Sequence, residues 1–381
     1  MIREYLQKEM WNGNQLSEDK GYLKCLAKLE KIGEFVIKPG LKRIGAIMEK
    51  LDSPEKKLKT IIVGGTNGKG TTCYKLEDLI KNNKLKVGCF TSPHLHTIRE
   101  RFRVDGKIIE KEEFVKIFNR VNDVAKKNRI QITYFEITTA MAYLYFEYNK
   151  VDLAIMEVGM GGEFDAVNVG RGDIVVLTTL GLDHMSYLGD TIGEIGLTKG
   201  KIVRENSQVV TGWEKENWKY IPTCEQIQFG KDSDEWTKIV STLLDMNYEK
   251  RLIEIPGRME IYQNFILDGA HNVQAVKRLI GEVKEVENVI FSCMEDKDVG
   301  GMLSLFPDNI ELFVCGIKNE RGMNTKEIIA NAERNKIECR SFESVEKAIE
   351  DVGTKKTLIT GSFYCVSEAR VKLKMKGSEE N

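Results

Sequence analysis

Short apolar runs rich in β-branched residues alternate along most of the chain with longer segments of helical periodicity. In the first part of the chain, this pattern predicts strands at 60–63, 86–90, 152–157 and 174–178. The same pattern predicts helices at 71–82, 111–127, 136–148 and 191–198. Strands that alternate with helices in this way are typical of parallel sheets with crossover helices.

A polar stretch without strong periodicity runs from about 213 to 250 and ends at Pro256-Gly257. We therefore expect a domain boundary there, which divides the chain into 1–255 and 256–381. Beyond the boundary, further strands are predicted at 261–267, 288–292, 311–315 and 356–360, with helical stretches between them. The predicted fold class is α/β, with a P-loop-type, mostly parallel sheet domain followed by a smaller doubly wound, Rossmann-like C-terminal domain.

Composition narrows the classes of partner and compartment. The chain of 381 residues has 57 Lys and Arg against 58 Asp and Glu, so its charge gives no reason to expect nucleic acid or a membrane surface as partner. Residues 1–14 are charged and lack the apolar core of a signal peptide, and no apolar run is long enough to span a bilayer. The eight cysteines stand singly, without paired spacing, as expected of reduced, mostly buried thiols. We expect a cytoplasmic protein.

The first predicted strand leads into a glycine-rich loop that carries a lysine, in the sequence TIIVGGTNGKGTTC at 60–73. Glycines let such a loop turn its amides toward one concavity, and the helix that follows adds its N-terminal dipole. Lys69 can place a point charge on nucleotide phosphates, and Thr71 can offer its hydroxyl to Mg²⁺. Gly70 stands between the two, unlike in the common P-loop pattern. The alternative is a glycine-rich turn that binds nothing.

The few histidines and two acidic residues follow predicted strands. The chain has four histidines, each at or beside a turn after an apolar run: His94, His96, His184 and His271. Asp183 and His184 follow the strand predicted at 174–178, and Glu157 ends the strand predicted at 152–157. Ligands bind at the carboxyl ends of strands in open α/β sheets, where a carboxylate and an imidazole can complete a Mg²⁺ shell. Taken singly, Glu157 also fits a helix-cap or loop carboxylate and His184 a surface histidine, but their joint placement favours a metal.

Eight motifs in order resemble the folylpolyglutamate synthase and dihydrofolate synthase family of the Mur ligase superfamily. They span nearly the whole chain: GTNGKGT at 65–71, FTSPHL at 90–95, EVGMGG at 157–162, GLDH at 181–184, LGDTI at 188–192, PGR at 256–258, DGAHN at 268–272 and TGS at 360–362.

The resemblance implies an ATP- and Mg²⁺-dependent ligase that adds L-glutamate to a folate or dihydropteroate acceptor. The acceptor carboxylate would attack the γ-phosphate to give an acyl phosphate, which the α-amine of glutamate then attacks. Catalysis of this kind is mostly positioning and charge neutralisation. No side chain is assigned as general base.

The resemblance also implies roles for individual residues. Catalysis would involve Lys69, Glu157, His184 and Lys199. The nucleotide would be held by Thr66, Asn67, Gly68, Lys69, Gly70 and Thr71, with Arg258, Asp268 and His271 from the second domain. Magnesium ions would be coordinated by Thr71, Ser92, Glu157, His184 and a carbamylated Lys199. The acceptor and glutamate would contact Ser92, Pro93, His94, Phe135, Glu136 and Ser362.

Several of these residues also have ordinary structural interpretations. Lys199 fits a solvated helix lysine and Phe135 a core residue. Arg258 fits a linker salt bridge, and Asp268 and His271 fit helix capping near the start of the next helix. The sequence leaves these alternatives open.

The chain departs from the family pattern at three places. Lys199 lies in Thr198-Lys199-Gly200-Lys201-Ile202, where the family has Glu-Lys-Ala-Gly-Ile. Glu163 stands where the family has an arginine, and a reversed charge weakens recognition of an anionic group. Residues 205–255 lack the family's Gly-x-His-Gln-x-x-Asn element, whose asparagine helps to bind the adenine nucleotide.

Three functions therefore remain open. The first is the folate-type glutamate ligase, and the second is a ligase of the same chemistry with a non-folate acceptor. The third is a nucleotide-binding paralogue that has lost turnover. The family suggests a monomer with small-molecule substrates.

Overall fold

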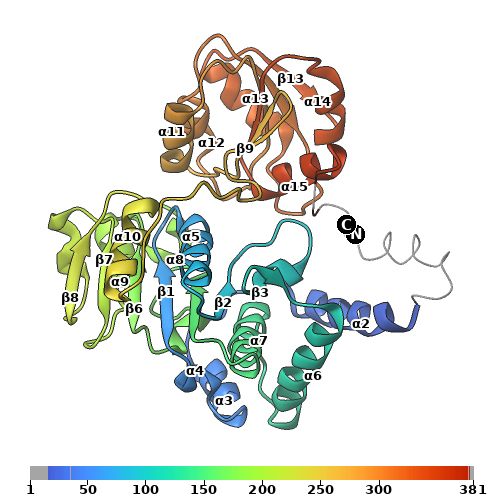
Figure 1. Ribbon diagram of the computed structural model, residues 1–381. Helices are drawn as coiled ribbons and strands as arrows, with labels where there is room; N and C mark the ends of the chain where they lie inside the picture. Colours follow the sequence, from blue (N-terminus) through green and yellow to red (C-terminus); the bar gives the residue numbers. More distant parts are fainter. Residues whose placement is uncertain (1–15, 35, 376, 378–381) are drawn as a thin grey trace. The chain divides into compact units, whose positions relative to one another are not determined.

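The computed structural model describes the chain except for residues 1–15, 35, 376 and 378–381. The expectation for the N-terminal segment 1–14 lies outside the described residues. The chain divides into two compact units (Figure 1). The first comprises the described residues up to His94 together with Ile98–Arg251, and the second comprises Leu95–Thr97 and the described residues from Leu252 onward.

The first unit is built on a sheet of eight strands in the order β4-β3-β2-β5-β1-β6-β7-β8. Neighbours pair in parallel from β2 to β8, whereas β3 and β4 form an antiparallel extension at one edge. The strands are β1 (Thr60–Gly64), β2 (Val87–Phe90), β3 (Phe102–Val104), β4 (Lys107–Ile108), β5 (Leu153–Glu157), β6 (Ile174–Leu177), β7 (Gln208–Thr211) and β8 (Gln226–Phe229).

Helices cover both faces of this sheet (Figure 1). The α-helices are α2 (Leu16–Ile32), α3 (Lys42–Lys50), α4 (Pro54–Lys57), α5 (Lys69–Asn82), α6 (Lys111–Lys127), α7 (Tyr134–Tyr148), α8 (Met185–Leu188), α9 (Ile192–Gly200) and α10 (Ser233–Leu243). The 3₁₀-helices are η1 (Ile98–Arg101), η2 (Ala166–Val169) and η3 (Lys215–Tyr220).

Alternation along the central strands divides the hydrophobic core of this unit in two. Ile61 and Val63 of β1 point into a core with α5 and α10, whereas Ile62 between them joins the core with α2, α3, α6 and α7. The period of two in a strand places successive side chains on opposite faces. Because both faces are covered, the strands read as continuous apolar runs.

The second unit repeats this plan on a smaller scale. Its six strands lie in the order β13-β12-β11-β14-β10-β9, and only β9 runs antiparallel to its neighbour. The strands are β9 (Glu260–Tyr262), β10 (Phe265–Leu267), β11 (Asn288–Phe291), β12 (Glu311–Cys315), β13 (Cys339–Phe342) and β14 (Thr357–Thr360). The helices are α11 (Val273–Glu282), α12 (Val299–Leu303), α13 (Thr325–Arg334), α14 (Val345–Asp351) and α15 (Phe363–Lys372).

The predicted fold class is confirmed, and the expected strands and helices of the first part of the chain are present with ends shifted by a few residues. The unit boundary falls after Arg251. Two predictions are wrong in detail. The stretch 213–250 contains β8 and α10 within the first unit, and the strand expected at 261–267 is a hairpin that turns at Gln263, where φ is 54°.

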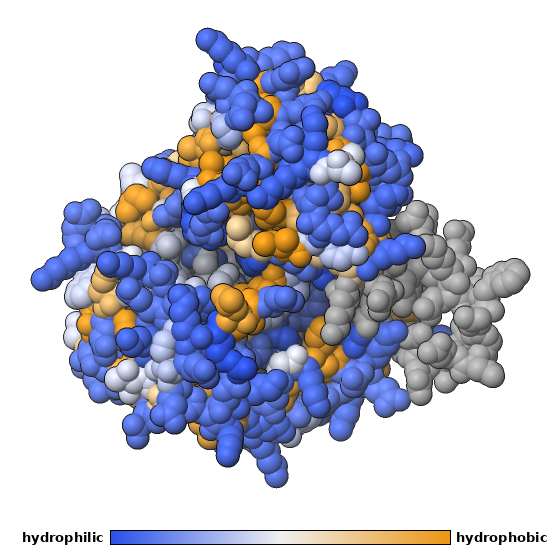
Figure 2. Space-filling view, turned by 45° about the horizontal axis from the view of Figure 1, so that its top comes forward, coloured by the Kyte–Doolittle hydropathy of each residue, from blue (hydrophilic) through white to orange (hydrophobic). Residues whose placement is uncertain are grey.

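The surface is consistent with the high content of charged residues. Figure 2 shows one face on which hydrophilic residues predominate and apolar residues form scattered patches. All eight cysteines are free thiols, six of them buried, as the sequence predicts. Among the described residues, no helix is both long and apolar enough to cross a membrane.

Candidate active site

The loops after β1 and β6 diverge at the centre of the first sheet. The chain leaves β1 through α5 toward β2 on one side, and leaves β6 through α8 and α9 toward β7 on the other. Such a switch point opens a crevice at the carboxyl edge of a parallel sheet, where ligands bind. The glycine-rich loop and the Asp183-His184 pair both lie in these two loops.

The glycine-rich loop is fixed to the loop after β6 by hydrogen bonds. The amide of Thr66 donates to the carbonyl of Thr179 over 2.7 Å, and the amide of Asn67 donates to the Thr179 hydroxyl over 2.9 Å. Gly65 allows this approach because its φ is +127° and a Cβ there would overlap the hydroxyl of Thr178. The loop is therefore held in one conformation before any ligand binds.

Helix α5 presents its N-terminus from this loop. Gly68 is its N-cap residue and supplies no side-chain cap, so the amides of the first turn lack the partner that a cap would give. Amides at a helix N-terminus, together with the helix dipole, favour an anion. Lys69 lies over the loop, with Nζ donating to the carbonyls of Gly65 at 3.2 Å and Thr66 at 3.1 Å. This geometry fits a triphosphate.

Lys199 reaches the same loop from α9. Its side chain is 3% exposed, and Nζ donates to the carbonyl of Gly65 over 3.1 Å. Burial, reinforced by the charge of Lys69, lowers the pKa of Lys199 to about 7, although Asp183 and Asp165 act in the opposite direction. The interpretation of Lys199 as a solvated helix lysine is therefore wrong, and its amine is readily available in the neutral form.

Acidic side chains lie near the glycine-rich loop, but they do not form a complete metal-binding site by themselves. Glu157 is buried at the end of β5, where its Oε2 accepts the amide of Ser92 over 2.8 Å. Asp183 is buried beside His184, whose Nε2 lies 3.9 Å from Asp183 Oδ2. Within the described residues, no three His, Cys, Asp or Glu side chains gather as a metal site. These donors fit a Mg²⁺ held largely by phosphate oxygens, which needs few protein ligands.

Asp165 is a site residue that sequence reasoning missed. Its carboxylate is buried and accepts the amides of Met160 over 3.0 Å and Val167 over 2.9 Å, so it fixes the loop that follows Glu157. Burial raises its pKa to about 6, and these amides together with Lys69 partly offset the rise. The signal in the sequence was an Asp two residues before Val167, the spacing of a side-chain-capped turn.

Trp236 is a second residue that the sequence did not reveal. It belongs to α10, which packs against α5, and its indole Nε1 donates to the carbonyl of Gly230 over 2.6 Å. The ring edge lies 3.6 Å from where a Cβ on Gly68 would be, so the indole supports the N-cap of α5 from behind. Trp236 is 2% exposed. The part of the chain that lacks the family's asparagine element thus packs against α5, the helix that follows the glycine-rich loop.

The residues expected to contact the acceptor lie in three settings. Phe135 packs beside Phe90, with ring centroids 5.9 Å apart, and is half-buried. Glu136 completes a capping box with Thr133 at the start of α7, and its Oε2 accepts a hydrogen bond from Arg43 Nε over 3.2 Å.

The loop after β2 holds three more of these residues, Ser92, Pro93 and His94. The Ser92–Pro93 peptide bond is cis, and His94 Nδ1 accepts Arg101 Nε over 2.9 Å. The backbone of Ser92 is tied to Glu157, as described above.

In the second unit, the expected nucleotide residues gather at the start of α11 and α15. The Arg258 guanidinium lies over the ring of Phe363 at 4.3 Å, and the His271 ring lies 6.1 Å from the same ring. Asp268 accepts the amides of Met259 and Ala270, each over 2.9 Å.

Neighbouring side chains in the second unit cap helices. The Ser362 hydroxyl caps α15 by accepting the amide of Cys365 over 3.1 Å, and Asn272 caps α11. The capping expected near Asn272 is therefore made by Asn272 itself, and Asp268 instead closes the turn before it.

Comparisons with known proteins agree with this geometry. Residues 63–293 match the Mur ligase middle domain, and residues 257–361 match the Mur ligase glutamate ligase domain. The dihydrofolate synthase/folylpolyglutamate synthase of Bacillus subtilis is 30% identical over 414 residues, which cover 90% of this chain and 96% of that protein. The protein of the same name from Escherichia coli is 27% identical over 90% of this chain and 93% of its own length.

A solved structure extends the likeness to three dimensions. The bifunctional folylpolyglutamate synthase/dihydrofolate synthase of Yersinia pestis, complexed with AMPPNP and Mn, is 26% identical with a TM-score of 0.81. The match covers 93% of this chain and 98% of that one. The chain belongs to the folylpolyglutamate synthase/dihydrofolate synthase family of Mur ligases.

Proposed function

We propose that this protein is an ATP- and Mg²⁺-dependent ligase of folate metabolism that joins L-glutamate to a folate or dihydropteroate acceptor. The observation that carries the proposal is the glycine-rich loop with its uncapped helix N-terminus and two lysines on one carbonyl. The relatives named above are ligases of this kind, and the Yersinia pestis protein was solved with a nucleotide analogue and Mn.

The reaction explains why the site needs cations and backbone amides that stabilise negative charge. Oxide is a very poor leaving group, so a carboxylate does not condense with an amine in water. The acceptor carboxylate oxygen attacks the γ-phosphorus of ATP, the bond to the bridging oxygen breaks, and ADP leaves. The glutamate amine then attacks the acyl carbon, loses a proton and expels inorganic phosphate. Positioned cations and amides stabilise the charge that develops on the transferred phosphoryl group.

We assign the triphosphate to the loop Thr66–Thr71, with Lys69 as its point charge. Bound Mg²⁺ would supply charge neutralisation at the phosphate oxygens. The side chains that could hold it are those of Thr71, Ser92, Glu157 and His184. Asp183 lies beside His184 and orients that end of the site.

Lys199 is proposed to carry a carbamate. The neutral amine attacks the carbon of CO₂ and loses a proton, which forms a nitrogen–carbon bond. The two oxygens of the carbamate share one negative charge and could hold a second metal. The pKa of about 7 supports this reaction because CO₂ combines only with the unprotonated amine. A carbon-13 signal from labelled bicarbonate that disappears in Lys199→Ala would test the assignment directly.

The remaining assignments follow the family resemblance. Arg258, Asp268 and His271 are proposed for nucleotide binding, and Ser92, Pro93, His94, Phe135, Glu136 and Ser362 for the acceptor and glutamate. We also propose the domain limits 1–255 and 256–381, a monomer, and a cytoplasmic location, which the eight unpaired cysteines favour.

A panel assay tests the function. Purified protein is supplied with ATP, Mg²⁺ and L-glutamate, together with dihydropteroate, tetrahydrofolate or its polyglutamates, and products are identified by mass. The proposal expects ADP release and a product longer by one glutamate with at least one pteroate. If none of these acceptors led to ADP release and a longer product, the folate assignment would be refuted. Turnover only with a non-pterin acid would select the alternative ligase.

A further inference from the structure

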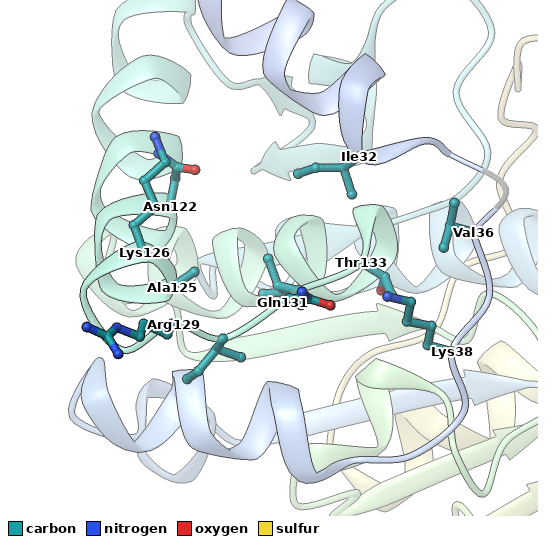
Figure 3. A pocket seen from close by; sticks show the side chains of 11 residues that line it. Ile32, Val36, Lys38, Asn122, Ala125, Lys126, Arg129, Gln131 and Thr133 are labelled. Carbon is teal, nitrogen blue, oxygen red and sulfur yellow. The ribbon is translucent and has the colours of Figure 1, made fainter.

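A hollow of about 540 Å³ in the first unit has no part in the site described above. It lies between the end of α2 and the C-terminal half of α6, and the segment leading into α7 forms its third side (Figure 3). We call it the α6 groove. Its lining comes entirely from the first unit.

The α6 groove has an apolar floor and a cationic rim. Aliphatic side chains supply the floor: Ile32, Val36, Ala125, Ile130 and Ile132. Lys38, Lys126 and Arg129 supply the charge, and the described residues that line the hollow include no Asp or Glu. Within the part of the chain that the structure describes, no ion pair is formed by these three cations. Their charge is therefore available to an anion.

Asn122 is an independent sign of a ligand. Its side chain lines the groove and is only 9% exposed, yet its Nδ2 has no hydrogen-bond partner (Figure 3). A buried amide donor left without a partner costs about 1–3 kcal/mol, so native proteins rarely keep one without a use. A carboxylate oxygen in the groove would satisfy it.

The arrangement selects an extended anion. Asn122 and Lys126 are four residues apart on α6, and Arg129 follows three residues later, just beyond the helix end at Lys127. On α6, Asn122 and Lys126 therefore lie on the same face, about 6 Å apart along the axis, and Arg129, whose φ is 55°, extends this row past the helix end. A single phosphate would engage one end of such a row, whereas a chain of carboxylates can follow all of it. An uncharged flat ring would leave all three cations unneutralised.

The position of the groove links it to the acceptor segment. Thr133 lines the groove and is the N-cap of α7, and Phe135 lies two residues further along that helix. We propose that the α6 groove binds the γ-linked oligoglutamate tail of an elongated acceptor or product. The proposal rests on the proposed function, because only a glutamate ligase would encounter such a tail. Each added glutamate brings one free carboxylate, which matches a row of cations over an aliphatic floor.

Direct binding tests the groove without relying on turnover. Fluorescein-labelled penta-γ-L-glutamate is titrated with wild type, with the double variant Lys126→Glu/Arg129→Glu, and with Lys127→Glu as control. Lys127 is exposed on the same helix but does not line the groove. We expect wild type and Lys127→Glu to bind alike and the double variant to bind at least about tenfold more weakly. Equal binding by all three proteins would overturn the proposal.

Kinetics separate this site from the reaction centre. In the double variant, KM for a pentaglutamyl acceptor should rise about tenfold, while KM for tail-free dihydropteroate changes less than about twofold. A parallel rise for both acceptors would overturn the tail assignment. Displacement of the peptide by an equal concentration of inorganic phosphate would do so as well, because it would mark a general anion site.

Asn122→Leu provides a variant that should not unfold. Because the amide is unpartnered, we expect an unchanged or higher melting temperature together with weaker peptide binding. A lower melting temperature with full binding would contradict the proposal. If no pteroate is turned over but the peptide still binds through Lys126 and Arg129, the groove stands and the proposed function fails. If turnover is normal but the peptide does not bind, the groove fails alone.

Discussion

The carboxyl edges of the two sheets use polar residues in opposite ways. At the first sheet, the loops after β1, β5 and β6 bury groups of both charges, and Lys199 and Asp165 have pKa values displaced toward neutrality by burial. At the second sheet, Asp268 and Ser362 are engaged by amides of their own turns and helix starts. Both are carboxyl edges of mostly parallel sheets, and the residues expected to bind nucleotide or substrate differ in this way between them.

The difference indicates where the chemistry is concentrated. Displaced pKa values are costly to keep and cluster at functional sites. Locally satisfied side chains, by contrast, stabilise turns and helix ends first and can serve a ligand only in addition. We therefore expect substitutions at the first edge to affect turnover most, and those at the second edge to affect nucleotide affinity or local stability.

The largest effect is expected from Lys69→Ala. Removing this cation from the glycine-rich loop should lower kcat by about two to three orders of magnitude, if its charge acts on the transferred phosphoryl group as proposed. The far-UV circular dichroism spectrum should not change, since Lys69 bonds only to carbonyls of its own loop. Turnover close to that of wild type would show that the loop does not hold the triphosphate.

Gly65→Ala should damage the same loop through its backbone. A methyl group there would overlap Thr178, and φ of +127° is unfavourable for alanine, so we expect a loss of about 3 kcal/mol in unfolding free energy. The matched control is Gly45→Ala in α3, where a Cβ meets no atom within 4 Å. The Gly45→Ala change should leave the free energy of unfolding unchanged or raise it by up to about 1 kcal/mol. Urea denaturation measures both, and equal effects would contradict the proposed tight approach.

Lys199 gives the stability of the protein a predictable dependence on pH. Its pKa is about 7 in the folded state and 10.5 as the ordinary value, so between these pH values the unfolded chain holds the extra proton. The free energy of unfolding of wild type should therefore rise with pH relative to Lys199→Met. The expected gain is about 2 kcal/mol from pH 7 to 8.5.

Denaturation in CO₂-free buffer measures this difference, because a carbamate would change the titrating group. Below about pH 6, where Lys199 is protonated in both states, the difference between wild type and Lys199→Met should be constant. A difference that does not vary between pH 7 and 8.5 would mean that Lys199 remains charged in the folded protein.

The smallest expected effect comes from the second edge. Arg258→Ala should raise KM for ATP about tenfold with little change in kcat, if this side chain binds the nucleotide as proposed. Loss of its contact with Phe363 should cost less than about 1 kcal/mol in stability. Arg258→Lys is the informative control, since it keeps the charge but not the planar group. An unchanged KM in both variants would leave Arg258 with a structural role alone.

The sequence predicted the fold well because its periodicities are strong. β1 and α5 could be located from the apolar run and the glycine-rich loop alone, and the motif order identified the family. The stretch 213–250 was misjudged because α10 is amphipathic within a polar segment and its packing partner α5 is distant in sequence. Trp236 was missed for the same reason, because its ring supports Gly68, which is distant in sequence. Asp165 caps a local turn, and only its burial in the folded protein marks it as a site residue.

In the site, too, the sequence revealed residues that belong to a short motif but not those that depend on contacts between distant segments. Lys69 and Thr71 are encoded by one short motif, whereas the burial of Lys199 depends on α9 returning to the glycine-rich loop. Sequence alone favoured a solvated helix lysine at this position, whereas the structure buries it. Contacts between distant segments set pKa values, and no pattern in a single sequence reports them.

Transfer of oxygen from the acceptor to phosphate tests the central claim most directly. Dihydropteroate labelled with oxygen-18 in its carboxylate is incubated with the protein, ATP, Mg²⁺ and L-glutamate, and the released phosphate is analysed by mass spectrometry. The account predicts one labelled oxygen in each phosphate, because the carboxylate attacks the γ-phosphorus. Phosphate released without label, or released equally well without acceptor, would contradict it.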